Sequence, residues 1–118
     1  MIKSILFISM LLLTGCTIPS FQDDNESWAA NNVQFNVNKI NCYAADKTND
    51  VWQVKDSLAW LQLYSQAKNS KDIQPMIELM QSSVSTFKGD ISTTACLIKK
   101  QIMVEQAADL TQTIVRRY

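Results

Sequence analysis

The stretch DVWQVKDSLAWLQLYSQAK, from Asp50 to Lys68, decides the fold class. Its apolar residues recur at intervals of three and four, the spacing that places side chains on one face of an α-helix. An Asp just before the first apolar residue is a frequent N-cap. We therefore predict a helix over 51–68, capped by Asp50, that is apolar on two faces. Val51, Val54, Leu58 and Leu61 form one face, and Trp52, Ala59, Leu63 and Ala67, flanked by Trp60 and Tyr64, form the other.

Two further helices follow on the C-terminal side. Asp72 can cap the first of them, and Pro75 is tolerated in a first turn because its amide would be free anyway. Gly89 stands where a left-handed C-cap belongs. Ser92 or Thr93 can cap the last helix, predicted over 93–116. The helix that follows Asp72 has an apolar stripe of Ile73, Met76, Ile77, Met80, Val84 and Phe87. The last helix has an apolar stripe of Cys96, Met103, Ala107, Leu110 and Ile114, widened by Leu97, Val104 and Val115.

The segment before Asp50 is less regular. Ala29, Val33, Val37, Ile40 and Ala44 recur at helical spacing, which favours a helix capped by Asn25 or Ser27, followed by a loop around 46–49. The alternation of apolar residues over 33–37 leaves a strand open as the alternative. Four helices with short connections predict an all-α fold, a small four-helix bundle. The scarcity of turn residues agrees, because the whole chain has 2 Gly and 2 Pro.

The N-terminus has the plan of a secretory signal peptide: Lys3, then an apolar run from Ile5 to Leu13, then small residues. This run is too short to span a bilayer. Leu13-Thr14-Gly15-Cys16 resembles a bacterial lipobox. The resemblance implies that Cys16 carries a lipid on its sulfur, becomes the new N-terminus and is acylated there, with palmitate among the acyl groups. The alternative is a plain signal peptide with an incidental Cys. We expect a signal peptide over 1–15, a lipidated tether over 16–27 and a helical domain over 28–118.

Thr17 follows the lipidated Cys. In lipoproteins of Gram-negative bacteria an Asp there usually marks retention at the inner membrane, so Thr17 predicts an outer-membrane lipoprotein whose domain faces the periplasm. Cys42 and Cys96 then lie in an oxidising compartment, where pairing is expected. Two buried free thiols or a reactive site are the alternatives. We expect Arg116 and Arg117 to interact only with the helix dipole.

Several kinds of chemistry are excluded or disfavoured by composition. The chain has no His, which excludes imidazole catalysis and imidazole metal ligands. Gly89 alone builds no phosphate loop or nucleophile elbow. With 11 basic and 11 acidic residues, no strong field attracts nucleic acid. We expect no catalytic residues, no metal and no cofactor, and an interaction protein rather than an enzyme.

The lipobox, the Cys42 to Cys96 spacing and the step FKGDISTTAC, over 87–96, resemble the type II secretion pilotins of the PulS/OutS family. That family's step is an aromatic, then Asp, then Ser or Thr, then Cys at the start of the last helix. Around Cys42 this chain lacks the family's charged, Pro-containing step. The resemblance implies a helical, disulfide-bonded outer-membrane lipoprotein that uses the lipoprotein sorting machinery. It implies a partner too, the C-terminal segment of a secretin, which becomes helical in an apolar groove.

The surplus apolar surface of helix 51–68 and the following Met-bearing helix predict where such a groove lies. The candidates are Trp52, Trp60, Leu63, Tyr64, Met76, Leu79 and Met80. The competing interpretation is that all seven belong to the core. Other candidate functions are a periplasm-facing lipoprotein subunit of conjugation, of surface exclusion or of a different secretion machine, and then a small lipid-anchored enzyme or inhibitor.

Overall fold

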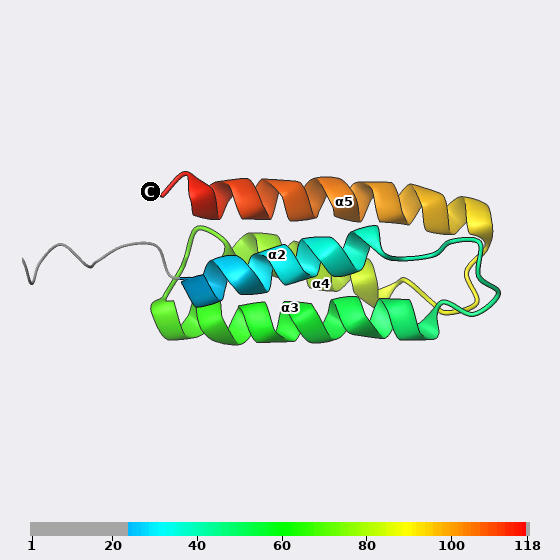
Figure 1. Ribbon diagram of the computed structural model, residues 1–118, viewed down its shortest axis with the longest axis horizontal. Helices are drawn as coiled ribbons and strands as arrows, with labels where there is room; N and C mark the ends of the chain where they lie inside the picture. Colours follow the sequence, from blue (N-terminus) through cyan, green and yellow to red (C-terminus); the bar gives the residue numbers. More distant parts are fainter. Residues whose placement is uncertain (1–23, 118) are drawn as a thin grey trace, which may run out of the picture.

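The computed structural model describes residues 24–117, and this part of the chain folds into four α-helices without a strand (Figure 1). The predicted all-α four-helix bundle is therefore confirmed. The expected signal peptide and the lipidated Cys16 lie outside the described residues. The helices are α2 (Asp24–Asn38), α3 (Thr48–Lys68), α4 (Gln74–Ser85) and α5 (Thr93–Val115).

The helices pack as a closed ring. α2 contacts α3 and α5, and α4 contacts the same two helices, whereas the diagonal pairs do not touch within residues 24–117. Consecutive helices run antiparallel, as Figure 1 shows. The bundle therefore has an α2–α3 side and, on the opposite side, an α4–α5 side. One end of the bundle carries the start of α2 and the end of α5. The other end carries the two long connections, α2 to α3 and α4 to α5.

The core is built from the predicted apolar stripes. Phe87 is its largest fully buried side chain, and removing such side chains from water stabilises a fold by ~1.5–3 kcal/mol each. Met76, Val104 and Tyr64 are half-buried and pack against it. The buried apolar residues contributed by the helices are Ala29, Ala30, Val33, Val37, Val51, Val54, Leu58, Leu61, Ile77, Met80, Val84, Cys96, Met103, Ala107, Leu110 and Ile114.

The first helix differs from the prediction at both ends. α2 begins at Asp24 and ends at Asn38, so residues 24–27 are helical and the tether boundary at 27 was wrong. The reason is Glu26, a polar residue that suggests solvent but is fully buried in an ion pair. Ile40 and Ala44 continue the helical spacing, yet they lie in the connection that follows.

α3 begins at Thr48, two residues before the predicted cap, Asp50. The Asp50 side chain does not cap α3 and instead accepts a hydrogen bond from the backbone N–H of Asn41 (3.0 Å).

Gly89 is not the C-cap of α4, which ends at Ser85 with Thr86 after it. Its φ is not positive, so conformational freedom does not explain a glycine here. The close approach of Thr48 does, because a Cβ on Gly89 would lie 2.1 Å from the Thr48 hydroxyl oxygen. The Gly89 carbonyl also accepts a hydrogen bond from the Lys47 backbone N–H (3.0 Å). The left-handed C-cap in the structure is Asn69, with φ 56°, at the end of α3.

The Cys42–Cys96 disulfide ties the α2–α3 connection to the first turn of α5, with an S–S distance of 2.07 Å. The predicted pairing is confirmed. Two lysines reinforce the same end of the bundle by donating to loop carbonyls, Lys47 Nζ to Ile91 O (3.1 Å) and Lys100 Nζ to Ile40 O (2.8 Å). Ser92 caps α5 as predicted, because its hydroxyl accepts from the Ala95 backbone N–H (3.2 Å).

Candidate functional site

The seven predicted groove residues do not form one site. Met80 is fully buried in the core, so its assignment to a binding surface was wrong. Tyr64 and Met76 are half-buried, each packing against the core. The four remaining candidates are exposed large apolar side chains: Trp52, Trp60, Leu63 and Leu79.

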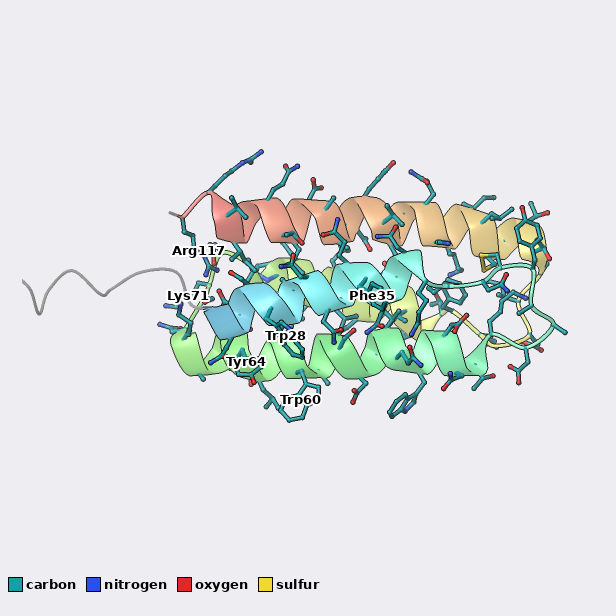
Figure 2. The ribbon with its side chains drawn as sticks, in the orientation of Figure 1. Trp28, Phe35, Trp60, Tyr64, Lys71 and Arg117 are labelled. Atoms are coloured by element: carbon teal, nitrogen blue, oxygen red, sulfur yellow. A yellow bond between two sulfur atoms is a disulfide. The ribbon has the colours of Figure 1, made fainter. Side chains whose placement is uncertain are left out.

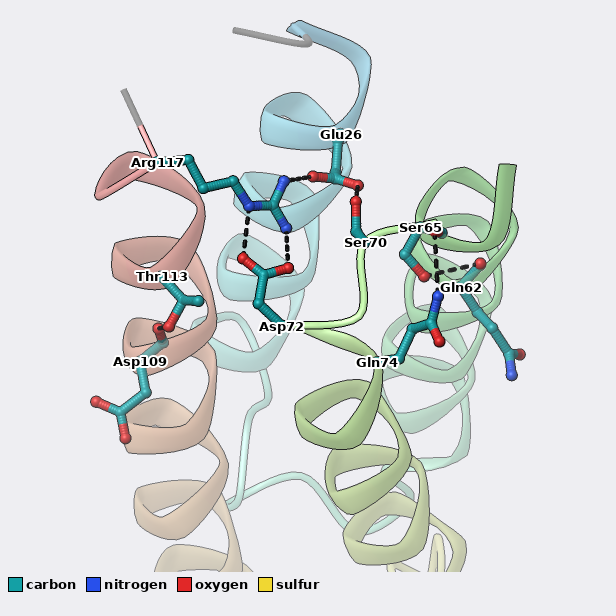
Figure 3. A network of polar contacts seen from close by, with 9 residues as sticks. All are labelled: Glu26, Gln62, Ser65, Ser70, Asp72, Gln74, Asp109, Thr113 and Arg117. Carbon is teal, nitrogen blue, oxygen red and sulfur yellow. Dashed lines mark hydrogen bonds and ion pairs between the residues drawn. The ribbon is translucent and has the colours of Figure 1, made fainter. Parts of the chain in front are cut away.

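The boundary between α3 and α4, where the groove was expected, is polar. Gln81 Nε2 donates to Gln62 Oε1 (3.1 Å), and Gln74 Nε2 donates to the Ser65 carbonyl (3.3 Å). Figure 3 shows the contact of Gln74 with Ser65. Two hollows remain on this boundary, one of about 290 Å³ whose lining includes Trp52 and Phe87, and one of about 320 Å³ lined by Lys55, Gln81, Val84 and Ser85. Leu79 belongs to the other side of α4, because it lies one turn before Ser83, which faces α5. The seven candidates therefore do not share one groove on α3 and α4.

Aromatic side chains gather instead on the α2–α3 side. The rings of Trp60 and Tyr64 lie 6.4 Å apart on α3. Figure 2 shows Trp28 of α2 at the same level along the bundle as these two rings. Phe35 lies further along α2, and Lys39 Nζ stands 5.5 Å from its ring centre. We call Trp28, Trp60 and Tyr64 the aromatic face.

A cleft opens on the opposite side, between α4 and α5. Its volume is about 230 Å³. We call it the α4–α5 cleft. It is lined by Ser82, Ser83, Thr86, Lys99, Ile102 and Met103.

The cleft exists because α4 is short. α4 has 12 residues and α5 has 23, so α4 is about 18 Å long against about 35 Å for α5. The first turns of α5 therefore have no full-length helix beside them. Ile98 and Ile102, one turn apart, are 59% and 47% exposed there, and Leu79 on α4 is 58% exposed. Ile102 lines the cleft, and Ile98 and Leu79 lie one turn from the lining residues Ile102 and Ser83. We call these three residues the apolar rim.

The polar groups of the cleft are partly satisfied. Lys99 Nζ donates to Thr86 Oγ1 (2.6 Å), and Gln106 Nε2 donates to Ser83 Oγ (3.3 Å). The side-chain oxygen of Gln106 is buried without a hydrogen-bond partner among the described residues. Unsatisfied buried acceptors are rare in native proteins. The α4–α5 boundary thus leaves one buried acceptor unsatisfied among the described residues.

An ion-pair network lies at the end of the bundle where the described chain begins and ends, opposite the end with the disulfide (Figure 3). The Arg117 guanidinium donates to both carboxylate oxygens of Asp72 and to Glu26. Ser70 Oγ donates to the other oxygen of Glu26 (2.7 Å). The expectation that Arg117 serves only the helix dipole was wrong, because it joins α5 to α2 and to the α3–α4 connection.

The network also changes proton affinities. The two hydrogen bonds from Arg117 lower the pKa of the Asp72 carboxyl below its ordinary value, and burial opposes this only in part. Reciprocally, Asp72 and then Glu26 raise the pKa of the Arg117 guanidinium. Asp72 and Arg117 therefore remain charged together at neutral pH.

Within residues 24–117, no cluster of three or more Cys, Asp or Glu is placed to hold a metal ion. None of the described helices has the length and hydropathy needed to cross a bilayer. What the described surface offers chemically is apolar contact area on two opposite sides.

The residues that sequence reasoning missed are Ile98 and Ile102 on the rim. Both share a recognisable signal with Leu79 and Trp28: they are large apolar residues that fall off the core stripe of their own helix. No protein-family model, curated protein or solved structure matches the chain.

Proposed function

We propose that the protein is an outer-membrane pilotin of a type II secretion system. It binds the C-terminal segment of a secretin subunit and carries that subunit to the outer membrane by the lipoprotein sorting route. The support from sequence is the lipobox that ends at Cys16, the absence of Asp at position 17 and the resemblance of residues 87–96 to pilotins.

The structural observation that carries the proposal is the α4–α5 cleft with its apolar rim. An amphipathic helix buries anchors at positions i, i+3 or i+4, and i+7 in such a groove. Leu79, Ile98 and Ile102 are exposed at the cleft or one turn from its lining. A helix docked along α4 and α5 removes these side chains from water.

The cleft also suggests how the docked segment is oriented. Lys99 stands on its wall beside Thr86, and within the cleft lining it is the charged residue. A carboxylate on the secretin segment, or the negative end of its helix dipole, gains a favourable contact with this ammonium group. We therefore infer a segment with apolar anchors on one face and an acidic group or its C-terminal end near Lys99.

The proposal is tested in cells that encode the protein. Its deletion should leave secretin multimers missing from the outer membrane, and the wild-type chain should restore them. The protein solubilised in detergent should also co-purify with the secretin. Secretin multimers that assemble normally without the protein contradict a pilotin role. Recovery of a conjugation or surface-exclusion component in place of the secretin supports the alternative of another lipoprotein subunit.

A further inference from the structure

We propose that the bundle rests on the membrane surface through its aromatic face, Trp28, Trp60 and Tyr64. This inference rests on the lipid anchor of the proposed function. It adds an orientation: the anchor and the aromatic side chains together hold the α2–α3 side against the bilayer, and the α4–α5 cleft points away from it.

The aromatic face is largely exposed and lies towards the end of the bundle at which the described chain begins. Trp28 and Trp60 are 65% and 52% exposed, and Tyr64 is half-buried against the core. Trp28 stands in the second turn of α2, and the two α3 rings are near the end of the helix that packs against α2. Figure 2 shows all three towards the end of the bundle at which the described chain begins. Two helices thus present one surface there.

The chain outside the structure identifies the occupant of this surface. Eight Cα–Cα steps separate Cys16 from Asp24. Even fully extended, they span at most about 28 Å. A lipid on Cys16 therefore keeps the start of α2 close to the headgroups, and Trp28 follows within four residues of Asp24.

The chemistry of the face fits the same occupant. Trp and Tyr are enriched at membrane interfaces, because their rings are apolar and their N–H and O–H groups stay hydrated. Lys71 and Arg116 are exposed at this end, while Glu26 and Asp72 are bound by Arg117. Asp24 begins α2 at the same end and adds a negative charge there. We therefore expect the aromatic rings to contribute more to membrane binding than the charged side chains do.

The orientation leaves the partner site accessible. The α2–α3 and α4–α5 sides are opposite in the ring of helices, because α2 does not contact α4 and α3 does not contact α5 among residues 24–117. When the aromatic face meets the membrane, the cleft faces the aqueous phase, where a secretin segment can enter. Membrane contact and segment binding therefore do not compete.

Tryptophan fluorescence tests the orientation, because the chain holds 3 Trp and Trp52 is a matched control. Trp52 is 60% exposed on α3, like Trp60, but it stands about 12 Å further along the helix axis. Three variants of the full lipidated chain keep one Trp each, with the other two replaced by Phe. Each is placed in vesicles of phosphatidylethanolamine and phosphatidylglycerol that contain brominated lipid, a short-range quencher.

The expected result is strong quenching of Trp28 and Trp60, weak quenching of Trp52, and little change at high salt. Equal quenching of all three, or none at Trp28 and Trp60 in a lipidated chain that floats with the vesicles, overturns this inference alone. A chain whose intact mass shows no lipid overturns the anchor as well. If a secretin peptide shields Trp28 and Trp60 from acrylamide without vesicles, the aromatic face is the peptide site, and the inference is wrong.

Discussion

Arg117 forms an ion pair with Glu26, a residue 91 positions earlier whose side chain is fully buried. The pair joins the first turn of α2 to the end of α5. Through Asp72, the same guanidinium also holds the α3–α4 connection. The end of the bundle next to the tether is therefore fixed by charge, as its other end is fixed by the disulfide.

Replacing Arg117 by Met should destabilise the fold strongly. Glu26 would lose the guanidinium that pairs with it, and removing one partner of a buried ion pair typically costs ~3–5 kcal/mol. Arg116→Met is the matched control, because the Arg116 side chain is exposed and surface changes usually stay within ~0.5 kcal/mol. Urea denaturation at neutral pH measures both. Equal stabilities of the two variants would show that the network contributes nothing.

The network also predicts a pH dependence through Asp72. Its pKa is lowered in the folded state, so below the ordinary value of 3.8 the unfolded chain binds the proton more readily. The contribution to the free energy of unfolding is complete above that pH and is lost as the pH falls through the folded pKa. Asp72→Asn should make stability fall less steeply in this acid range. Parallel curves for the two proteins, from urea denaturation at each pH, would contradict this.

Removing the disulfide should cost much of the domain's stability. The bridge closes a loop of 54 positions, for which chain entropy gives about 4 kcal/mol. The double variant Cys42→Ala, Cys96→Ala should melt at a much lower temperature, and a reductant should lower the melting temperature of the wild type only. Thiol labelling of periplasm-derived protein checks the premise. If both cysteines label under denaturing conditions without reductant, the bridge is absent in the cell.

Changes at the lipobox should redirect the protein. Cys16→Ala removes the thiol that receives the lipid, and we expect that variant to lose its membrane association. Thr17→Asp should divert the protein to the inner membrane. Membrane fractionation with intact-mass analysis decides between these outcomes. A Cys16→Ala protein that still floats with outer membranes would rule out the anchor.

The helices and their core stripes were predictable because apolar residues spaced three and four apart are a local pattern that can be read from each segment alone. Val51, Val54, Leu58 and Leu61 are buried as expected, and Leu79 is exposed as its position off the stripe suggested. Ser92 caps α5 for an equally local reason, because its hydroxyl needs only the backbone N–H three residues on.

What was missed depends on long-range contacts. Glu26 and Asp72 look like a solvated acid and a helix cap until Arg117, the penultimate residue, is placed between them. Gly89 looks like a C-cap until Thr48 is brought against it. Met80 belonged to the core stripe of its helix, so selecting it for the groove set aside a local signal that was correct. The cleft itself follows from helix lengths and from which helices are neighbours, which no single stripe reveals.

The most direct test of the central claim is titration of the domain with a peptide of the secretin's C-terminal segment. Leu79→Ser and Ile102→Ser change the rim, and Leu63→Ser is the control, since Leu63 is 59% exposed on α3 against 58% for Leu79. We predict that both rim variants bind at least about tenfold more weakly, a loss of about 1.4 kcal/mol, while Leu63→Ser binds as the wild type does and all melting temperatures stay within a few degrees. Unchanged binding by the rim variants, or a wild-type domain that does not bind the peptide, would contradict the account.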